Sequence, residues 1–150
     1  MAKYVAKVTR TASATLDVGS VIAAASAPRR LQFYDLMFGS DATPADVAFL
    51  WEAYKRTGAA TGGTAPTITP LDEGDTIAST GVSNQAPTTN GAGGSVVKLS
   101  IPLNGRATFR WVAFPGSELV TAATVSTGVA LATPTMTAQA VEATMLFNEL

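Results

Sequence analysis

Histidine and cysteine are both absent from this chain of 150 residues. Histidine has the unperturbed side-chain pKa nearest neutrality, and cysteine is the strongest nucleophile among unassisted side chains. Their absence excludes disulfides, thiol catalysis, the usual zinc sites and any Ser-His-Asp triad. Catalysis would have to use carboxylates, lysines or tyrosines, and the 11 acidic residues are scattered along the sequence. We therefore expect a protein that binds or builds, not an enzyme, with no cofactor and no bound metal.

An excess of charge of either sign is also lacking. The chain has 10 lysines and arginines against 11 acidic residues, and Arg29-Arg30 is the only adjacent pair of arginines. Proteins that bind nucleic acid present a basic face or stripe. The apolar run at residues 21–25 is far shorter than the roughly 18 residues of a membrane-spanning helix. The alternating N-terminus does not have the pattern of a secretory signal. We expect a soluble protein with neither a nucleic acid nor a membrane as its partner.

Alternating apolar and polar residues predict short β-strands over most of the chain. The predicted strands cover residues 3–10, 14–18, 31–38, 119–126, 128–133 and 138–147. The stretch 31–38 is apolar on both faces except at Asp35, which indicates a central strand or an outer face that meets a partner. Residues 19–30 are expected to be irregular. Seven to nine short strands with turn residues between them predict a single all-β domain, a sandwich or jelly roll.

The dipeptide Asn104-Gly105 gives a strong local signal. It separates two alternating runs, residues 95–103 and 106–114. Asn-Gly between alternating strands favours a hairpin closed by a type I′ turn, because both central residues must accept positive φ. We therefore predict that these two runs pair with each other.

Residues 43–57 are ambiguous between helix and strand. Thr43, Pro44 and Asp46 resemble a helix N-terminus, and the apolar residues that follow have helical spacing. A period of two places Phe49 and Trp51 on one face of a strand instead. The local rules slightly favour the helix.

Residues 58–94 are rich in glycine, proline, threonine and serine and have little apolar periodicity. A structureless segment of this length is uncommon inside a compact domain, and it is usually functional or disordered. We predict a long loop or arm here. The glycine-rich runs in it lack the lysine-serine ending of a phosphate-binding loop, so they are read as flexible linkers.

Two small clusters of polar residues could carry chemistry. Asp72, Glu73 and Asp75 surround Gly74, a composition suited to calcium, but the EF-hand pattern is missing and a solvated turn is the favoured interpretation. Ser117 has no base within sequence reach, so a hydrolase is disfavoured. Neither cluster is assigned a function.

Aromatic residues and arginines supply the candidate interface. Trp51, Tyr54 and Trp111 could form a platform for sugar rings, although such aromatics most often fill the core. Arginines are good interface anchors because the planar guanidinium holds a carboxylate in two places, although exposed solubilising charge is an equally common role. The candidate interface residues are Arg29, Arg30, Trp51, Tyr54, Arg56, Arg110, Trp111 and Phe114.

Three segments together resemble a known class of protein. They are residues 49–57 (FLWEAYKRT) with 69–72 (TPLD) after a Gly/Thr loop, residues 110–119 (RWVAFPGSEL), and residues 145–149 (MLFNE). The arrangement resembles the cement or decoration proteins on the capsids of tailed bacteriophages, over most of residues 30–150. It is on this resemblance that residues 48–57 are assigned to a strand rather than a helix.

The resemblance implies a β-sandwich or jelly-roll subunit on the capsid surface of a virion, made in the host cytoplasm. It also implies a homotrimer that binds the major capsid protein and has neither enzyme activity nor cofactor. The alternatives are another virion component, such as a small shell, head-fibre or tail protein, and a carbohydrate-binding sandwich. On this hypothesis, the 58–94 segment could be an arm that becomes ordered on the shell or on a sister subunit.

Overall fold

A computed structural model of the chain describes residues 2–75, 81–94, 96–136 and 138–150. Within these residues every regular element is a β-strand, so the all-β prediction is confirmed. The strands are β1 (Lys3–Thr11), β2 (Asp17–Ala23), β3 (Leu31–Ala42), β4 (Ala48–Arg56), β5 (Ile68–Pro70), β6 (Gly81–Gln85), β7 (Val97–Asn104), β8 (Phe109–Val112), β9 (Leu119–Val120), β10 (Gly128–Ala132) and β11 (Ala140–Glu149).

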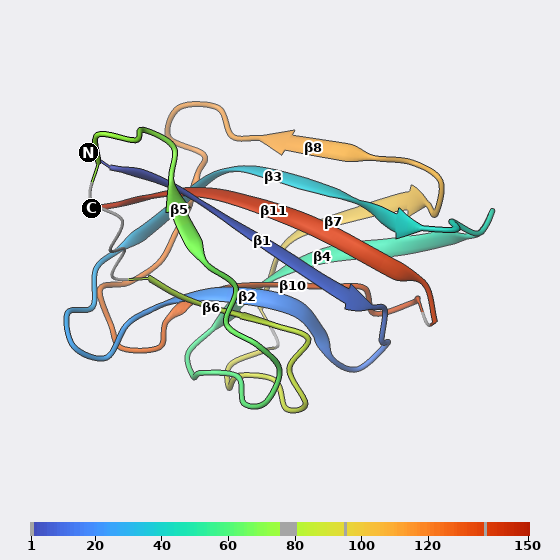
Figure 1. Cartoon of the computed structure of the whole chain (residues 1–150), viewed down its shortest axis with the longest axis horizontal. Helices are drawn as coiled ribbons and strands as arrows, with labels where there is room; N and C mark the ends of the chain where they lie inside the picture. The colour runs from blue at the N-terminus through green and yellow to red at the C-terminus, as the bar shows by residue number, and fades with distance from the viewer. Residues whose placement is uncertain (1, 76–80, 95, 137) are drawn as a thin grey trace.

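The strands form two antiparallel sheets that pack as a sandwich (Figure 1). Sheet A has the order β5-β1-β11-β3-β8, and β9 pairs with a second part of β3. Sheet B has the order β6-β2-β10-β4-β7. The first and last long strands, β1 and β11, are direct neighbours, with Lys3 opposite Asn148. The two ends of the chain therefore lie side by side at one end of the molecule.

The core lies between the two sheets and is built by alternate residues of the long strands. Tyr4 from β1 and Phe33 from β3 both contact the ring of Phe147 from β11 within sheet A. Phe38 of sheet A meets Trp51 of sheet B, with ring centroids 5.1 Å apart. Because each aromatic side chain buries about 150–250 Å², these contacts contribute strongly to joining the two sheets in a chain that has no cysteine for a disulfide.

Strand β4 shows why the helical signal at residues 43–57 fails. Its burial alternates, with Phe49 and Trp51 in the core. Thr43 has a φ of 39°, so the chain turns there instead of beginning a helix. The segment pairs with β10 on one side and with β7 on the other. As a strand in this position it buries more apolar surface than it would as an isolated amphipathic helix. The strand assignment is confirmed.

The predicted hairpin at Asn104-Gly105 is wrong. Strand β7 pairs with β4 in sheet B, whereas β8 pairs with β3 in sheet A. Gly105 is not among the residues with positive φ, so the turn is not type I′. The Asn104 side chain accepts the N–H of Arg106, and the Gly105 N–H binds the Val47 carbonyl. The chain thus passes from one sheet to the other at a corner, and Ser95, where the first run starts, lies outside the described residues.

Two predicted strand boundaries also differ from the structure. The second strand begins at Asp17 and runs to Ala23, because Ser13 accepts backbone N–H groups from Thr15 and Leu16 in a turn. Residues 19–23 carry no alternation because β2 is buried along its whole length. The predicted strand 119–126 is limited to β9, since a turn closed by Thr127 N–H to the Thr124 carbonyl follows it.

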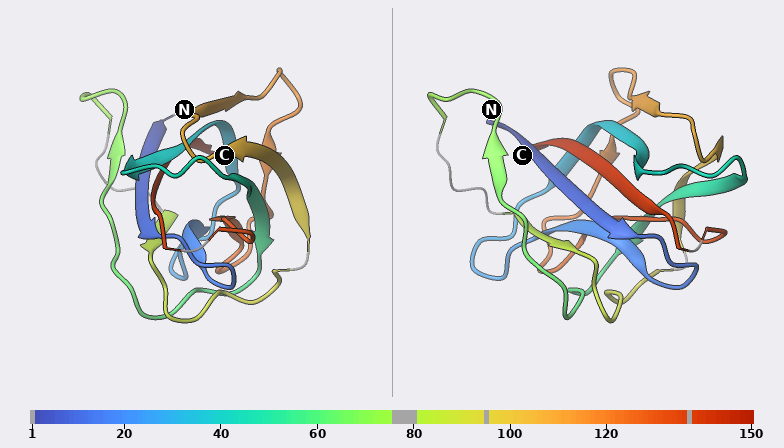
Figure 2. Two further views of the ribbon diagram at one scale, coloured as in Figure 1. Left: turned by 90° about the vertical axis from the view of Figure 1, so that its right-hand side faces the viewer. Right: turned by 45° about the vertical axis from the view of Figure 1, so that its right-hand side comes forward.

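The predicted loop at 58–94 contains two edge strands and a strap, with residues 76–80 outside the described part. Strands β5 and β6 each add to one edge of a sheet. The strap consists of residues 57–67 and 86–94, two runs that cross the sheet B side of the sandwich (Figure 2). A bridge from Thr61 to Thr89 joins the two runs, and a bridge from Thr64 to Gln85 joins the first run to the end of β6. Apolar periodicity misses these strands because they are short and lie at sheet edges.

Candidate interaction surface

A rigid turn after β8 exposes the most prominent apolar side chain of the described residues. Phe114 is 82% exposed. Pro115 and Gly116 follow it, and Gly116 has a φ of 88°. The Ser117 N–H donates to the Phe114 carbonyl at 2.8 Å. Proline at the second position and a positive-φ glycine at the third define a type II turn. We call residues 114–117 the knob.

Further hydrogen bonds hold the knob in this shape. The Ser117 hydroxyl also donates to the Phe114 carbonyl, at 2.8 Å. The Gly116 N–H donates to the Glu118 carboxylate, at 2.8 Å. On its other side the chain is tied to β3, because the Ala113 N–H donates to the Tyr34 carbonyl. A turn fixed in advance loses little conformational entropy when it binds a partner.

An apolar strip crosses the outer face of sheet A beside the knob. It consists of Val5, Met37, Val112 and Leu146. In each strand the neighbours of these residues are buried or half-buried and point toward the core. Because successive side chains of a strand point to opposite faces, all four residues face outward. The ladder pairs Val5 with Leu146, and Leu146 pairs with Asp35, whose other partner is Val112. Met37 and Val112 are 38% and 54% exposed.

The Arg110–Asp35 ion pair sits within this strip. Both carboxylate oxygens of Asp35 accept from the Arg110 Nε at 3.0 Å, and Nη2 binds one of them as well. Asp35 is buried, whereas the Arg110 side chain is 62% exposed. Hydrogen bonding to Asp35 and its charge raise the pKa of Arg110. The pair explains the lone carboxylate in an otherwise apolar strand.

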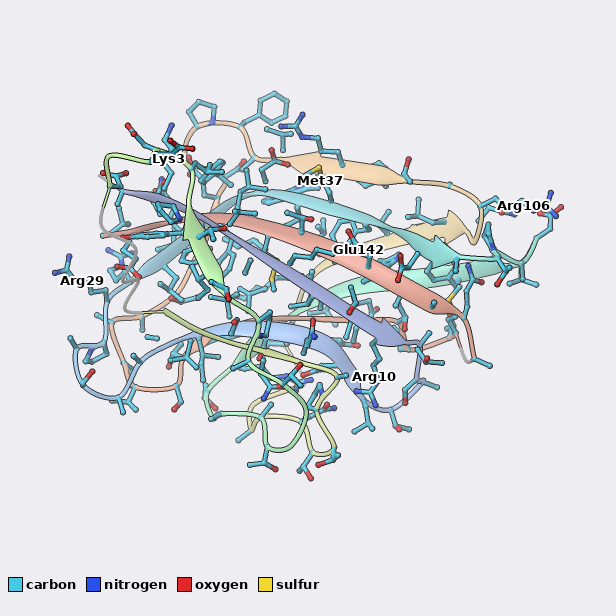
Figure 3. The ribbon with its side chains drawn as sticks, in the orientation of Figure 1. Lys3, Arg10, Arg29, Met37, Arg106 and Glu142 are labelled. Atoms are coloured by element: carbon cyan, nitrogen blue, oxygen red, sulfur yellow. The ribbon has the colours of Figure 1, made fainter. Side chains whose placement is uncertain are left out.

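A shallow depression of about 520 Å³ opens further along the same face. Met37 contributes an apolar side chain to it, Asp41 and Glu142 contribute carboxylates, and Arg110 also lines it. Lys7 forms an ion pair with Glu142 at 2.6 Å. Figure 3 shows Met37 and Glu142 near the centre of this face, with Arg29 at one end of the molecule. We call this hollow the depression.

The structure separates the predicted interface residues into two groups. Trp51 is fully buried in the core and Arg56 is 6% exposed, so neither is available to a partner, and Tyr54 is half-buried on the sheet B side. Trp111 packs against the core. Arg29 and Arg30 are exposed just before β3, and Arg110 and Phe114 are exposed on the sheet A side. The exposed residues are Arg29, Arg30, Arg110 and Phe114.

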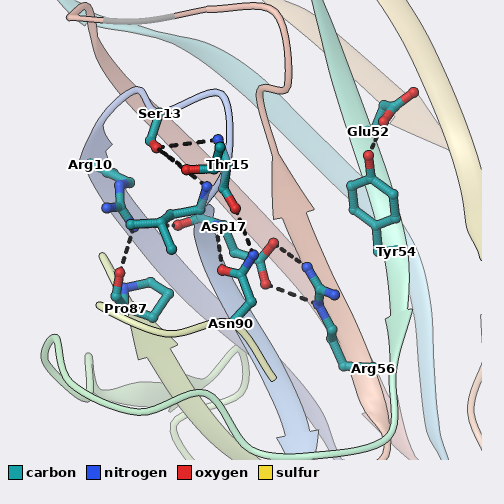
Figure 4. Close-up of polar contacts among 10 residues, drawn as sticks. Arg10, Ser13, Thr15, Asp17, Glu52, Tyr54, Arg56, Pro87 and Asn90 are labelled. Atoms are coloured by element: carbon teal, nitrogen blue, oxygen red, sulfur yellow. Dashed lines mark hydrogen bonds and ion pairs between the residues drawn. The ribbon is translucent and has the colours of Figure 1, made fainter. Parts of the chain in front are cut away.

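Arg56 has a structural role beneath the strap (Figure 4). Its guanidinium donates to both carboxylate oxygens of Asp17. The Asn90 side chain accepts the Asp17 N–H at 2.8 Å and donates to the Thr15 carbonyl at 2.9 Å. A Cβ on Gly94 would lie 1.7 Å from Arg56 Nη1, so a larger residue here would displace the Arg56 guanidinium. Burial raises the pKa of Asp17, an effect that the Arg56 hydrogen bonds oppose.

Tyr54 lies beside this cluster, and its hydroxyl donates to the Glu52 carboxylate. Burial is the main reason that the pKa of Tyr54 is raised to about 12, and the hydrogen bond to Glu52 adds to it. The Arg56 guanidinium lies 5.4 Å from the centre of the Tyr54 ring. Because Tyr54 is engaged here and Trp51 is buried, the two do not form a shared surface for sugar rings.

The acidic turn at residues 71–75 is closed by its own hydrogen bonds. The Asp72 carboxylate accepts the Gly74 N–H at 2.9 Å, and the Asp72 carbonyl accepts the Asp75 N–H at 3.0 Å. Among the described residues, no group of three or more carboxylates is arranged to hold a metal ion. In the same part of the chain, no helix is long and apolar enough to span a membrane.

Sequence reasoning missed Met37, Asp41 and Glu142 as surface candidates. Met37 lies in a strand that is apolar on both faces. This pattern predicted an outer face that meets a partner, but it did not identify Met37 as one of the residues on that face. Asp41 and Glu142 have no sequence signal, because only pairing of β3 with β11 brings them to one depression.

Comparisons with protein-family models, with curated proteins and with solved structures find no match for this chain.

Proposed function

We propose that this chain is a structural assembly protein, a decoration subunit of a tailed-bacteriophage head. In this proposal it forms a homotrimer, binds the major capsid protein on the outer surface of the shell and stabilises the shell. Three linked copies that engage neighbouring shell subunits gain avidity without a strong single contact. The protein acts through shape and contact, and no catalytic residue is assigned.

The observation that carries the proposal is the knob beside the apolar strip. A phenyl ring that is 82% exposed costs solubility unless a partner covers it, and here a hydrogen-bonded turn holds it outward. Aromatic side chains and arginines dominate the energetics of protein interfaces. Phe114 and Arg110 lie on the same side of the sandwich, which supports a docking function for that side.

The assignment to a phage head comes from the sequence resemblance. One of the three segments that carry it, residues 110–119, includes both Arg110 and the knob. The carbohydrate-binding alternative has weaker support, since Trp51 lies in the core. Another virion component, such as a head-fibre or tail protein, would use the same surface and is separated from a decoration subunit by experiment.

The test is co-sedimentation of the purified protein with heads that lack it, taken from the phage that encodes the chain. We expect saturable binding and a higher temperature of head disruption when the protein is bound. Heads of an unrelated phage serve as the control and should show neither effect. Failure to bind the cognate heads at micromolar concentrations, or binding to tails alone, would overturn the decoration proposal.

A further inference from the structure

The knob and the depression lie on the same side of one chain but cannot meet within it. Phe114 lies five residues from Phe109, a distance of about 17 Å along an extended strand. Between them β8 is held in register on β3, with Arg110 opposite Met37 and Val112 opposite Asp35. We propose that the knob of one copy inserts into the depression of a second copy. This inference rests on the proposed homotrimer, for which it names the contact between subunits.

The apolar parts of the two surfaces match. The knob presents the Phe114 ring, and the depression presents Met37, which is 38% exposed. The hollow of about 520 Å³ can take a phenyl ring with its proline neighbour. Insertion would cover the exposed side chains of Phe114 and Met37 at once.

The charges around the two surfaces also match. Arg29 and Arg30 precede β3 on the side of the knob, since Phe33 pairs with Leu119 soon after the knob. Neither arginine takes part in an ion pair among the described residues. The depression carries Asp41, Glu142 and Arg110; Glu142 is paired with Lys7 and Arg110 with Asp35, so Asp41 is the one of the three without an ion pair among the described residues. Arg29 and Arg30 of one copy would therefore approach Asp41 on the next copy.

Contact between two different surfaces has a consequence for symmetry. A knob that binds a different surface on the next copy makes a heterologous contact, which generates a ring if the rotation closes and a filament if it does not. Every copy in a closed ring has its knob inserted and its depression filled. The proposed trimer is the closed form, and no copy is left with an exposed Phe114.

The absence of cysteine from the chain allows a direct test. Ser117→Cys places one thiol on the exposed knob, and Thr108→Cys places one at the exposed border of the depression. A disulfide requires Cα atoms within about 7 Å, so the two positions of one chain cannot be linked to each other. We expect an oxidised mixture of the two variants to give a dimer that contains one chain of each kind. The double variant should give covalent trimers.

Three results would overturn the contact. Cross-linking of either single variant to itself as efficiently as in the mixture would indicate a two-fold contact. The mixture could also stay uncross-linked while light scattering shows that wild-type trimers are present. Long ladders of cross-linked chains instead of trimers would show that the rotation does not close.

A second test measures association without cysteines. Phe114→Ser should weaken self-association by about 30-fold or more, the scale of an interface hot spot. Val82→Ser removes a comparably exposed apolar side chain from β6, on the opposite edge of the sandwich, and should leave association unchanged. Reversing Arg30 to Glu should weaken association, and the added change Asp41→Arg should restore it. Unchanged association of Phe114→Ser would overturn the inference.

The two proposals fail in different ways. A wild-type chain that stays monomeric at high concentration contradicts the homotrimer and the contact together. If Phe114→Ser stays trimeric but no longer binds phage heads, the knob docks on the shell, so the contact between copies is wrong and the decoration function stands. If Phe114→Ser becomes monomeric and wild-type trimers do not bind heads, the contact is supported and the decoration function fails.

Discussion

At the scale of single residues, two buried threonines differ in how their hydroxyls are used. Thr133 is fully buried and its hydroxyl has no hydrogen-bond partner. Thr121 is also buried, but its hydroxyl accepts the Leu31 N–H at 3.0 Å. An unpaired buried hydroxyl costs about 1–3 kcal/mol, whereas a paired one does not. Replacement of threonine by valine should therefore change the free energy of unfolding in opposite directions at Thr133 and Thr121.

We predict that Thr133→Val raises the free energy of unfolding by about 1 kcal/mol, because valine has the same shape without the unpaired hydroxyl. Thr121→Val should lower it by about 1–3 kcal/mol, because the Leu31 N–H would then be buried without its side-chain acceptor. Urea denaturation of both variants checks the pair. Equal losses of stability at the two sites would contradict the prediction.

The buried Asp17–Arg56 pair gives a second prediction. Removing one partner leaves a buried charge without compensation, which costs about 3–5 kcal/mol. We expect Asp17→Leu and Arg56→Met each to lower the free energy of unfolding by roughly this amount. The double variant should be more stable than either single variant, since no buried charge remains. Denaturant unfolding of all four proteins measures the coupling, and simple addition of the two losses would refute it.

Tyr54 predicts how stability depends on pH. Its pKa in the folded protein is raised to about 12, above about 10 in an unfolded chain. Its contribution to stability is therefore complete below pH 10 and is lost as the pH rises toward 12. We expect the free energy of unfolding to fall less steeply over this range in Tyr54→Phe than in the wild type. Tyr4 and Tyr34, whose pKa values are also raised, are present in both proteins and do not affect the comparison.

Glu52→Gln is the matched variant for the pH experiment. It removes the charge that accepts the Tyr54 hydroxyl hydrogen bond while it leaves the ring half-buried. Since burial is the largest cause of the raised pKa, the variant should give a slope between those of wild type and Tyr54→Phe. A slope identical to that of Tyr54→Phe would show that the carboxylate alone raises this pKa.

At the scale of elements, long strands could be predicted from the sequence and their partners could not. Strands β1, β3 and β11 alternate or carry apolar residues on both faces, so local pattern identifies them. The hairpin predicted at Asn104-Gly105 was wrong because a turn sequence does not determine whether the next strand joins the same sheet. Pairing of β8 with β3 depends on contacts more than 70 residues apart in sequence, such as Arg110 with Asp35.

The candidate surface could be predicted only in part, for a similar physical reason. Arg110 and Phe114 were predicted as interface residues because of their side-chain types, and both are exposed on one side of the sandwich. The same rule selected Trp51 and Arg56, which are buried, because a sequence does not show which face of a strand is covered. Arg56 is covered by the strap, whose glycine and threonine composition predicted a flexible linker instead.

The strap should open before the rest of the molecule, because side-chain hydrogen bonds and isolated bridges, and not a strand ladder, hold it to the sandwich. We predict that Asn90→Ala speeds hydrogen exchange at the N–H of Thr57 and Ala86, which donate to carbonyls of the strap and of β2. Exchange in β1 and β11 should not change. Thr89→Ala, at an exposed strap position, is the control. If exchange rises equally in β11, the strap is not a separate unit of opening.

At the scale of the whole molecule, the order of strands in sheet A makes the two chain ends neighbours. Lys3 lies opposite Asn148, and β11 stands between β1 and β3 at the centre of the sheet. A peptide link between the ends would replace a contact that already exists. The fold therefore depends on having β11 beside β1 and not on where the chain begins, as is common for domains with adjacent ends.

We predict that a circular permutant with its ends joined by a short Gly/Ser linker and its chain opened between Thr124 and Val125 keeps the fold. Both residues are exposed, in a turn between β9 and β10, so opening there breaks no ladder. Opening between Leu36 and Met37 cuts β3, which pairs with β11 and β8, and should abolish cooperative unfolding. Circular dichroism and thermal melts compare the two. An unfolded Thr124 permutant would mean that the order of chain synthesis, and not strand adjacency alone, directs assembly of the sandwich.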